Sequence, residues 1–182
     1  MKNTPIIIVI AFLTSLVLYS FGRELWCPAG DLLPWSFDLW SQHNSQHLLD
    51  WYTPSHISHG LLFALLLRAV LSERGLKYGL SAAVLLESGW EILENSSFII
   101  NRYRESTIAL DYFGDSILNS LSDVMWCMLG YRVAVALPAW KVLSIFLAFE
   151  LITLVFIRDN LTLNVIMLIW PIEAIKTWQM GA

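Results

Sequence analysis

The chain has 182 residues, of which 57% are hydrophobic and 14% charged, and its mean hydropathy is +0.59. Soluble domains carry about 25% charged residues, so this composition argues against a soluble domain and indicates an integral membrane protein. The net charge is −4, and acidic side chains fall in the predicted outer loops, which argues against a nucleic-acid partner.

Apolar segments recur along the chain without a linker or an internal repeat, which predicts a single domain over residues 1–182. A helix needs about 20 mostly apolar residues to cross a bilayer. We therefore predict an all-α fold, a polytopic membrane bundle of about six transmembrane helices. The predicted spans are residues 5–21, 56–71, 78–100, 114–135, 140–156 and 161–178, the last interrupted by Pro171.

The distribution of Lys and Arg predicts the orientation, because these residues concentrate in cytoplasmic loops. With the N-terminus inside, Arg23, Arg102, Arg104 and Arg158 fall outside. The other basic residues fall inside, and they are Lys2, Arg68, Arg74, Lys77, Arg132, Lys141 and Lys176. This arrangement predicts that both termini are cytoplasmic.

The first predicted span resembles a signal peptide in its position, but no small-x-small cleavage site follows it, so we expect an uncleaved helix. The outer loop that comes next, residues 22–54, is rich in aromatic residues, which is typical of a segment at the membrane interface. We interpret it either as a lid over a cleft or as a plain aromatic belt. Cys27 in this loop is not expected to form a disulfide with Cys127, which lies inside a span.

Three consecutive predicted spans carry polar side chains at helical spacing. They are His56 and His59 in the second, Glu87, Glu91 and Glu94 in the third, and Asp115, Asn119 and Asp123 in the fourth. Spacings of three or four residues place each set on one helix face, and the rise per residue places all three sets in the outer half of the membrane. Ionisable groups at that depth are functional candidates, although a structural cluster that holds the helices together is the alternative.

For an enzyme, the candidate catalytic residues are Glu91, Glu94, His59 and Asp123. Glu91 or Glu94 would act as general base and His59 as proton shuttle or metal ligand. Asp123 would be a charge partner or a ligand. A divalent metal is a candidate cofactor, with His56, His59 and Asp115 as its ligands, because imidazole and carboxylate groups bind such ions.

All four histidines fall in one outward-facing stretch, and His43 and His47 have helical spacing. The loop between the third and fourth spans carries Arg102 and Arg104, which are candidates for binding a substrate phosphate or, alternatively, are interfacial residues that reach lipid headgroups.

Two amides, Asn95 and Asn119, complete the predicted substrate-binding set. Glu150 is isolated in the fifth span, where it either joins the cluster or pairs with a neighbour.

Three sequence blocks carry a resemblance to a known family. Residues 50–60, residues 87–95 with 102–104, and residues 114–123 resemble a family of small bacterial multi-pass inner-membrane proteins, domain of unknown function 2585, also grouped as uncharacterised protein family 0314. The resemblance covers essentially the whole chain and implies a location in the cell inner membrane, but it implies no activity. More loosely, the order of His, Glu and Asp across successive spans is similar to that of VanZ-like membrane proteins.

Three functional classes follow from these observations. The first is a membrane-embedded enzyme that acts on a lipid or lipid-linked envelope substrate. The second is a small proton-coupled transporter, and the third is a non-catalytic lipid-binding or scaffold protein. In all three, membrane lipids are the expected partners. The enzyme is favoured because the polar groups gather on one side of the membrane.

Overall fold

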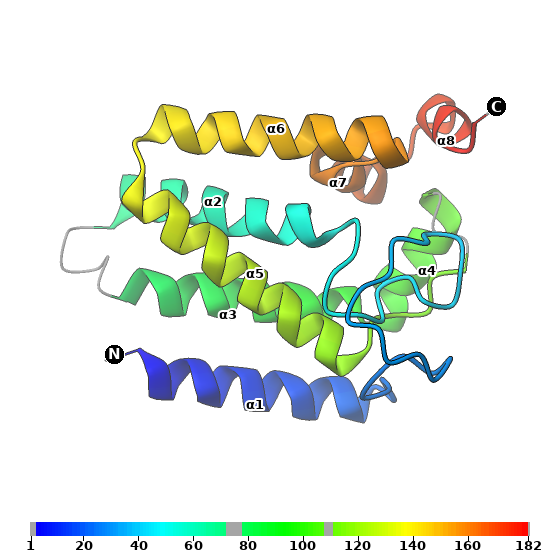
Figure 1. Ribbon diagram of the computed structural model, residues 1–182, viewed down its shortest axis with the longest axis horizontal. Helices are drawn as coiled ribbons and strands as arrows, with labels where there is room; N and C mark the ends of the chain where they lie inside the picture. Colours follow the sequence, from blue (N-terminus) through cyan, green and yellow to red (C-terminus); the bar gives the residue numbers. More distant parts are fainter. Residues whose placement is uncertain (1–2, 72–77, 108–110, 182) are drawn as a thin grey trace.

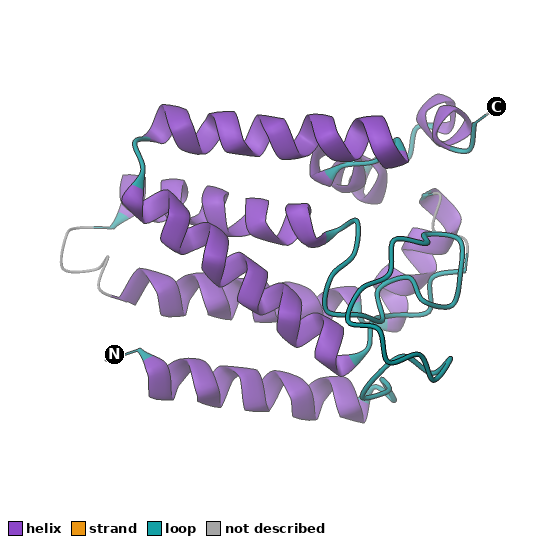
Figure 2. Ribbon diagram, viewed as in Figure 1, coloured by secondary structure: helices purple, strands orange, loops and turns teal. Residues whose placement is uncertain are grey.

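The computed structural model describes residues 3–71, 78–107 and 111–181. Over these ranges the chain forms eight helices and no strand, apart from one isolated bridge between Trp35 and Leu49 (Figure 2). The helices are α1 (Thr4–Ser20), α2 (Thr53–Val70), α3 (Gly79–Glu94), α4 (Ser97–Ser106), α5 (Ile117–Ala136), α6 (Ala139–Ile157), α7 (Leu161–Ile169) and α8 (Glu173–Gln179). The predicted all-α class is confirmed.

Five long helices, α1, α2, α3, α5 and α6, run along the long axis of the molecule (Figure 1). The three short helices and the loop of residues 22–52 gather at one end, which we call the loop end. The N-terminus lies at the opposite end and the C-terminus at the loop end. Among the described residues, the polar segments between helices are therefore concentrated at the loop end.

Helices α2 and α5 cross with their backbones in contact, and a glycine on each helix permits this. A Cβ atom added to Gly60 would overlap the carbonyl oxygen of Cys127, and one added to Gly130 would overlap that of Ile57. Small residues at a crossing are typical where helix backbones approach closely. This crossing aligns the polar faces of α2 and α5 at the loop end.

Among the described residues, α6 alone is both long and apolar enough to cross a membrane by length and composition, and α1 is a shorter apolar helix. One such helix is weak support for a membrane protein. The prediction of about six transmembrane helices is therefore not supported by helix length and composition. Three of the basic residues used to predict orientation, Lys2, Arg74 and Lys77, lie outside the described residues.

The third and sixth predicted spans differ most from the structure. The third was expected to continue to residue 100, but α3 ends at Glu94, and the Ser96 side chain caps a new helix, α4, by accepting from the Ile99 N–H. The sixth breaks near Pro171, as expected, but into two helices of 9 and 7 residues. Neither can return to the far end of the bundle. The structure therefore does not support the prediction that both termini lie on one side.

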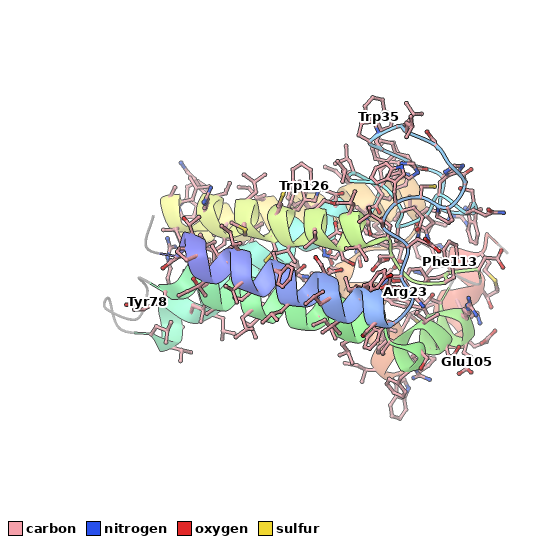
Figure 3. The ribbon with its side chains drawn as sticks, turned by 90° about the horizontal axis from the view of Figure 1, so that it is seen from below. Arg23, Trp35, Tyr78, Glu105, Phe113 and Trp126 are labelled. Atoms are coloured by element: carbon pink, nitrogen blue, oxygen red, sulfur yellow. The ribbon has the colours of Figure 1, made fainter. Side chains whose placement is uncertain are left out.

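The loop of residues 22–52 packs onto the start of α5 through hydrogen bonds. The Gln46 side chain donates to the Gly114 carbonyl, the Ser116 hydroxyl donates to the Gln46 carbonyl, and the Ile117 N–H donates to the Glu24 carbonyl. The Arg23 guanidinium donates to the Phe113 carbonyl, and Figure 3 shows these two residues together at the loop end. The loop is thus an ordered cap on the bundle.

Candidate functional site

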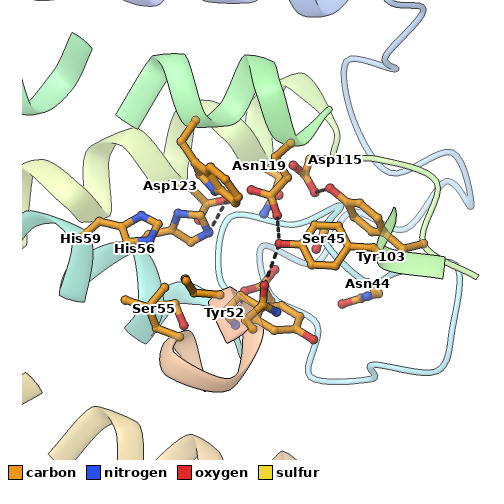
Figure 4. Close-up of a pocket in the computed structure, with 17 residues that line it drawn as sticks. Asn44, Ser45, Tyr52, Ser55, His56, His59, Tyr103, Asp115, Asn119 and Asp123 are labelled. Carbon is orange, nitrogen blue, oxygen red and sulfur yellow. Dashed lines mark hydrogen bonds and ion pairs between the residues drawn. The ribbon is translucent and has the colours of Figure 1, made fainter. Parts of the chain in front are cut away.

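A cavity of about 130 Å³ lies at the loop end, between the loop and helices α2, α3, α4, α5 and α7 (Figure 4). Its polar lining is Asn44, Ser45, Asp50, Tyr52, Ser55, His56, His59, Glu94, Tyr103, Tyr112, Asp115, Asn119, Asp123 and Asn164. Trp90, Leu161 and Val165 add an apolar side. None of these lining residues is Lys or Arg, so carboxylates dominate the charge of the cavity and favour a positively charged occupant.

At the inner end of the cavity, Glu87 joins the two histidines of α2. Its carboxylate is fully buried and lies 2.8 Å from the His56 Nδ1 atom and 2.9 Å from the His59 Nδ1 atom. Because a carboxylate only accepts hydrogen bonds, both histidines carry a proton on Nδ1. The Nε2 atom of each ring then remains for another partner.

Two further carboxylates, Glu91 and Asp123, lie close to the His56 ring. The His56 Nδ1 atom is 3.5 Å from Glu91 Oε1, and its Nε2 atom is 3.8 Å from Asp123 Oδ2 (Figure 4). Both Glu91 oxygens and Asp123 Oδ1 are buried without a hydrogen-bond partner among the described residues. A buried carboxylate oxygen without a partner is costly. This group is therefore built to hold a cation or a proton.

The outer part of the cavity is an ordered hydrogen-bond network around Asp115. The Tyr112 hydroxyl donates to Asp115 Oδ1 at 2.8 Å, and the Asn95 amide donates to Asp115 Oδ2 at 2.7 Å. Nearby, the Tyr103 hydroxyl lies 2.9 Å from both Glu94 Oε1 and Asn164 Oδ1. These bonds tie α3, α4 and α7 together around the cavity.

The Asp115 carboxyl gives a pH-dependent prediction. Burial raises its pKa from 3.8 to about 6, against the hydrogen bonds from Tyr112 and Asn95, which lower it. Between these pH values the folded protein keeps a proton that the unfolded chain has lost, so stability falls as pH rises through this window. We expect the Asp115→Asn variant to gain about 2 to 3 kcal/mol relative to the parent between pH 4 and 6.

Thermal unfolding of both proteins in detergent at several pH values measures this difference. The variant lacks the titrating group, so comparing the two cancels the groups that titrate in the same window without interacting with Asp115. A difference that stays constant from pH 4 to 6 contradicts the prediction.

Most of the predicted site residues are brought together. His56, His59, Glu94, Asp115, Asn119 and Asp123 line the cavity, and Glu91 and Asn95 are buried beside it. The Asn119 amide donates to the His47 carbonyl at 2.6 Å, so it positions the loop. Asp115 precedes α5 instead of lying within it, because Ser116 caps that helix.

The two arginines predicted to bind phosphate do not line the cavity. Arg102 donates to the Leu168 carbonyl at 2.9 Å, at the end of α7, and Arg104 donates to the Tyr112 carbonyl at 2.5 Å. Both guanidinium groups therefore hold backbone segments at the loop end.

The predicted metal ligands are divided between different groups of close donor atoms. Among the described residues, His56 and His59 group with Glu87, His56 also groups with Glu91 and Asp123, and Asp115 groups with Glu91 and Glu94. The set of Glu91, Asp123 and His56 fits a divalent cation best, since three of its four carboxylate oxygens have no hydrogen-bond partner among the described residues.

Sequence reasoning missed several residues of the site. The helical spacing placed Glu87 on the same face as Glu91 and Glu94, but Glu87 was not among the predicted site residues. Its full burial between two histidines shows that it belongs to the site. Asp50 and Tyr52 come from the loop, and Asn164 from α7, where no periodic pattern indicated an inward orientation.

Glu150 does not join the cavity. Its carboxylate accepts from the Leu161 and Thr162 N–H groups at 3.0 and 3.1 Å, which satisfies the start of α7. Glu150 therefore connects α6 to the start of α7.

These features define an all-helical protein with a buried, carboxylate-rich cavity capped by an aromatic loop. By comparison with known proteins, the chain belongs to the family described as protein of unknown function (DUF2585), whose model matches residues 18–181. It is 48% identical to a UPF0314 protein of Paracoccus denitrificans over 92% of this chain and 86% of the relative.

Other members of the family are similarly close. The chain is 52% identical to a UPF0314 protein of Rhizobium johnstonii over 91% of this chain and 85% of the relative. The chain is also 47% identical to a UPF0314 protein of Sphingopyxis alaskensis over 94% of this chain and 91% of the relative. No solved structure matches the chain. The similarity to VanZ-like proteins gains no support from these comparisons.

Proposed function

We propose that this chain is a membrane protein in which five helices, α1, α2, α3, α5 and α6, cross the bilayer. Large apolar side chains face outward, such as Phe12 on α1 and Leu151 and Val155 on α6, which are 61%, 61% and 76% exposed. The carboxylates and histidines face inward. Extensive exposed apolar surface around a polar interior supports contact with lipid.

An odd number of crossings places the two termini on opposite sides of the membrane, and in the structure the termini lie at opposite ends of the bundle. Arg68, Arg132 and Lys141 lie toward the end of the bundle away from the loop. The loop end carries the basic residues Arg23, Arg102, Arg104, Arg158 and Lys176, so the basic residues among the described ones do not decide which end of the bundle faces the cytoplasm across the inner membrane. In either orientation the cavity lies at the loop end of the bundle, near the lipid headgroups.

For the site, we propose a divalent-cation-dependent enzyme that hydrolyses an ester or phosphoester bond of a lipid or lipid-linked envelope substrate. The observation that carries this proposal is the buried pair of Glu91 and Asp123 next to His56: three of their four carboxylate oxygens have no hydrogen-bond partner among the described residues. A divalent cation there would neutralise the carboxylates, attract an anionic substrate into a cavity without Lys or Arg, and activate a bound water molecule.

The second histidine supplies the proton acceptor. Since His59 carries its Nδ1 proton toward Glu87, its Nε2 atom is free to accept a proton from water in the cavity. Glu87 would stabilise the resulting imidazolium. Because the described polar groups gather at the loop end, a hydrolytic site is better supported than a proton relay across the bundle.

Two measurements test the proposal. The first is the manganese and zinc content of the protein purified in detergent. The second is the envelope-lipid profile of a deletion strain that carries each variant. We expect His59→Ala and Asp123→Asn to accumulate normally but fail to restore the parental lipid profile, and Asp123→Asn also to lose bound cation. Glu105→Gln, an exposed carboxylate away from the cavity, is the matched control. Full restoration by both site variants would falsify the enzymatic proposal.

A further inference from the structure

A second convergence of ligating side chains lies outside the cavity, within the loop of residues 22–52. The Cys27 Sγ atom is 3.3 Å from His43 Nδ1, which is 3.3 Å from His47 Nε2. Cys27 and His47 are buried and His43 is half-buried. None of the three lines the cavity, so this cluster needs a separate explanation.

The tautomer of His47 is fixed by its surroundings. Its Nδ1 atom lies 2.6 Å from the Leu33 carbonyl oxygen. Because a carbonyl oxygen only accepts, the ring proton must be on Nδ1, and Nε2 carries a lone pair that faces His43. A carbonyl that orients a histidine in this way is the usual outer contact of a metal-binding histidine.

Two of the three separations in the cluster are close to those of a tetrahedral zinc site, and all three donor atoms lie within 4.8 Å of one another. Zinc binds nitrogen at about 2.0 to 2.1 Å and sulfur at about 2.3 Å, which places tetrahedral ligand atoms about 3.3 to 3.6 Å apart. Both measured separations are 3.3 Å. The pattern of one Cys and two His residues also has the ligand chemistry that zinc prefers.

A carboxylate lies beside one histidine of the cluster. Asp31 Oδ2 lies 3.8 Å from His43 Nδ1, while Asp31 Oδ1 accepts from the Leu33 N–H at 2.7 Å. The carboxylate is thus held beside the same histidine. Leu33 contacts both Asp31 and His47, so one short segment positions two of the four groups.

We propose that Cys27, His43 and His47 bind a zinc ion, with Asp31 completing the tetrahedron, and that this ion fixes the wall of the cavity. Residues 44 and 45, directly after His43, line the cavity, and the His47 carbonyl receives the Asn119 amide. The ion joins the start of the loop to the segment that covers the site. This assignment does not depend on the proposed enzymatic function.

Cobalt(II) substitution of the full chain in detergent tests the thiolate ligand directly. Protein loaded with an equimolar amount of cobalt is expected to show a thiolate-to-cobalt absorption band in the near ultraviolet. The band should persist in Cys127→Ser, which keeps Cys27, and disappear in Cys27→Ser. Parent protein without the band overturns the proposal, and this result does not depend on whether any variant folds.

Zinc content separates this site from the cavity. We expect Cys27→Ser and His47→Ala each to contain one zinc ion fewer per chain than the parent, and Glu91→Gln to keep that ion. A chelator should lower the unfolding temperature of the parent by more than that of Cys27→Ser, because the variant can lose only the cation of the cavity. Equal zinc content in the parent and both loop variants means that the three residues form only a hydrogen-bonded cluster, which contradicts the proposal.

Discussion

Adding a single methyl group at Gly130 is expected to destabilise the protein by about 3 kcal/mol, because overpacking of a tight contact cannot be relieved by a side-chain rotation. The added Cβ would overlap the Ile57 carbonyl oxygen, which belongs to the backbone of α2. The two helices would have to move apart, and the histidines of α2 would move away from Asp123. The double variant Gly60→Ala/Gly130→Ala is expected not to accumulate.

Gly89→Ala is the matched control, since it adds the same atom to an exposed helical glycine with nothing within 4 Å of the new Cβ. Alanine is the better helix former by up to about 1 kcal/mol, so this variant should be as stable as the parent or slightly more so. Thermal unfolding in detergent compares the three proteins. Equal unfolding temperatures for Gly130→Ala and Gly89→Ala are incompatible with a backbone contact at the crossing.

Replacing Glu91 with glutamine is expected to abolish function while leaving the metal-free protein as stable as the parent or more stable. The carboxylate is fully buried and neither oxygen has a hydrogen-bond partner among the described residues. An unpaired buried polar group costs about 1 to 3 kcal/mol, and an amide of the same shape removes the charge. Function should fall by at least about 100-fold if Glu91 binds the cation.

The two readouts are the lipid profile of a complemented deletion strain and the unfolding temperature in excess chelator. The same measurements on Glu105→Gln control for the loss of one negative charge. The opposite result, a destabilised variant that restores the lipid profile, means that Glu91 holds the helices together and takes no part in chemistry.

Helical periodicity was sufficient to predict the inner part of the site. His56 and His59, and likewise Asn119 and Asp123, lie on regular helices, where spacings of three and four residues fix a common face. The structure brings these two pairs to the same cavity. The all-α class followed from the same patterns, supported by the apolar composition.

The outer part could not be predicted because it depends on where helices end. Arg102 and Arg104 have the composition of a phosphate site, yet the break between α3 and α4 turns both toward backbone carbonyls. The regular spacing of His43 and His47 suggested a helix. In fact turns bring these rings together, with Ser45 between them at a φ of 57°. Such contacts come from loop geometry, which leaves no periodic signal.

The position of the two chain ends affects how metal binding is measured. Helix α8 is fastened at the loop end, where the Gln179 amide donates to Asp159 at 3.0 Å and Arg158 donates to the Trp178 carbonyl at 3.0 Å. A polyhistidine purification tag attached after α8 would emerge at the loop end, which holds both candidate metal centres, and could compete with them for ions. A tag before α1 would emerge at the far end of the bundle, where its own metal would stay separate from theirs.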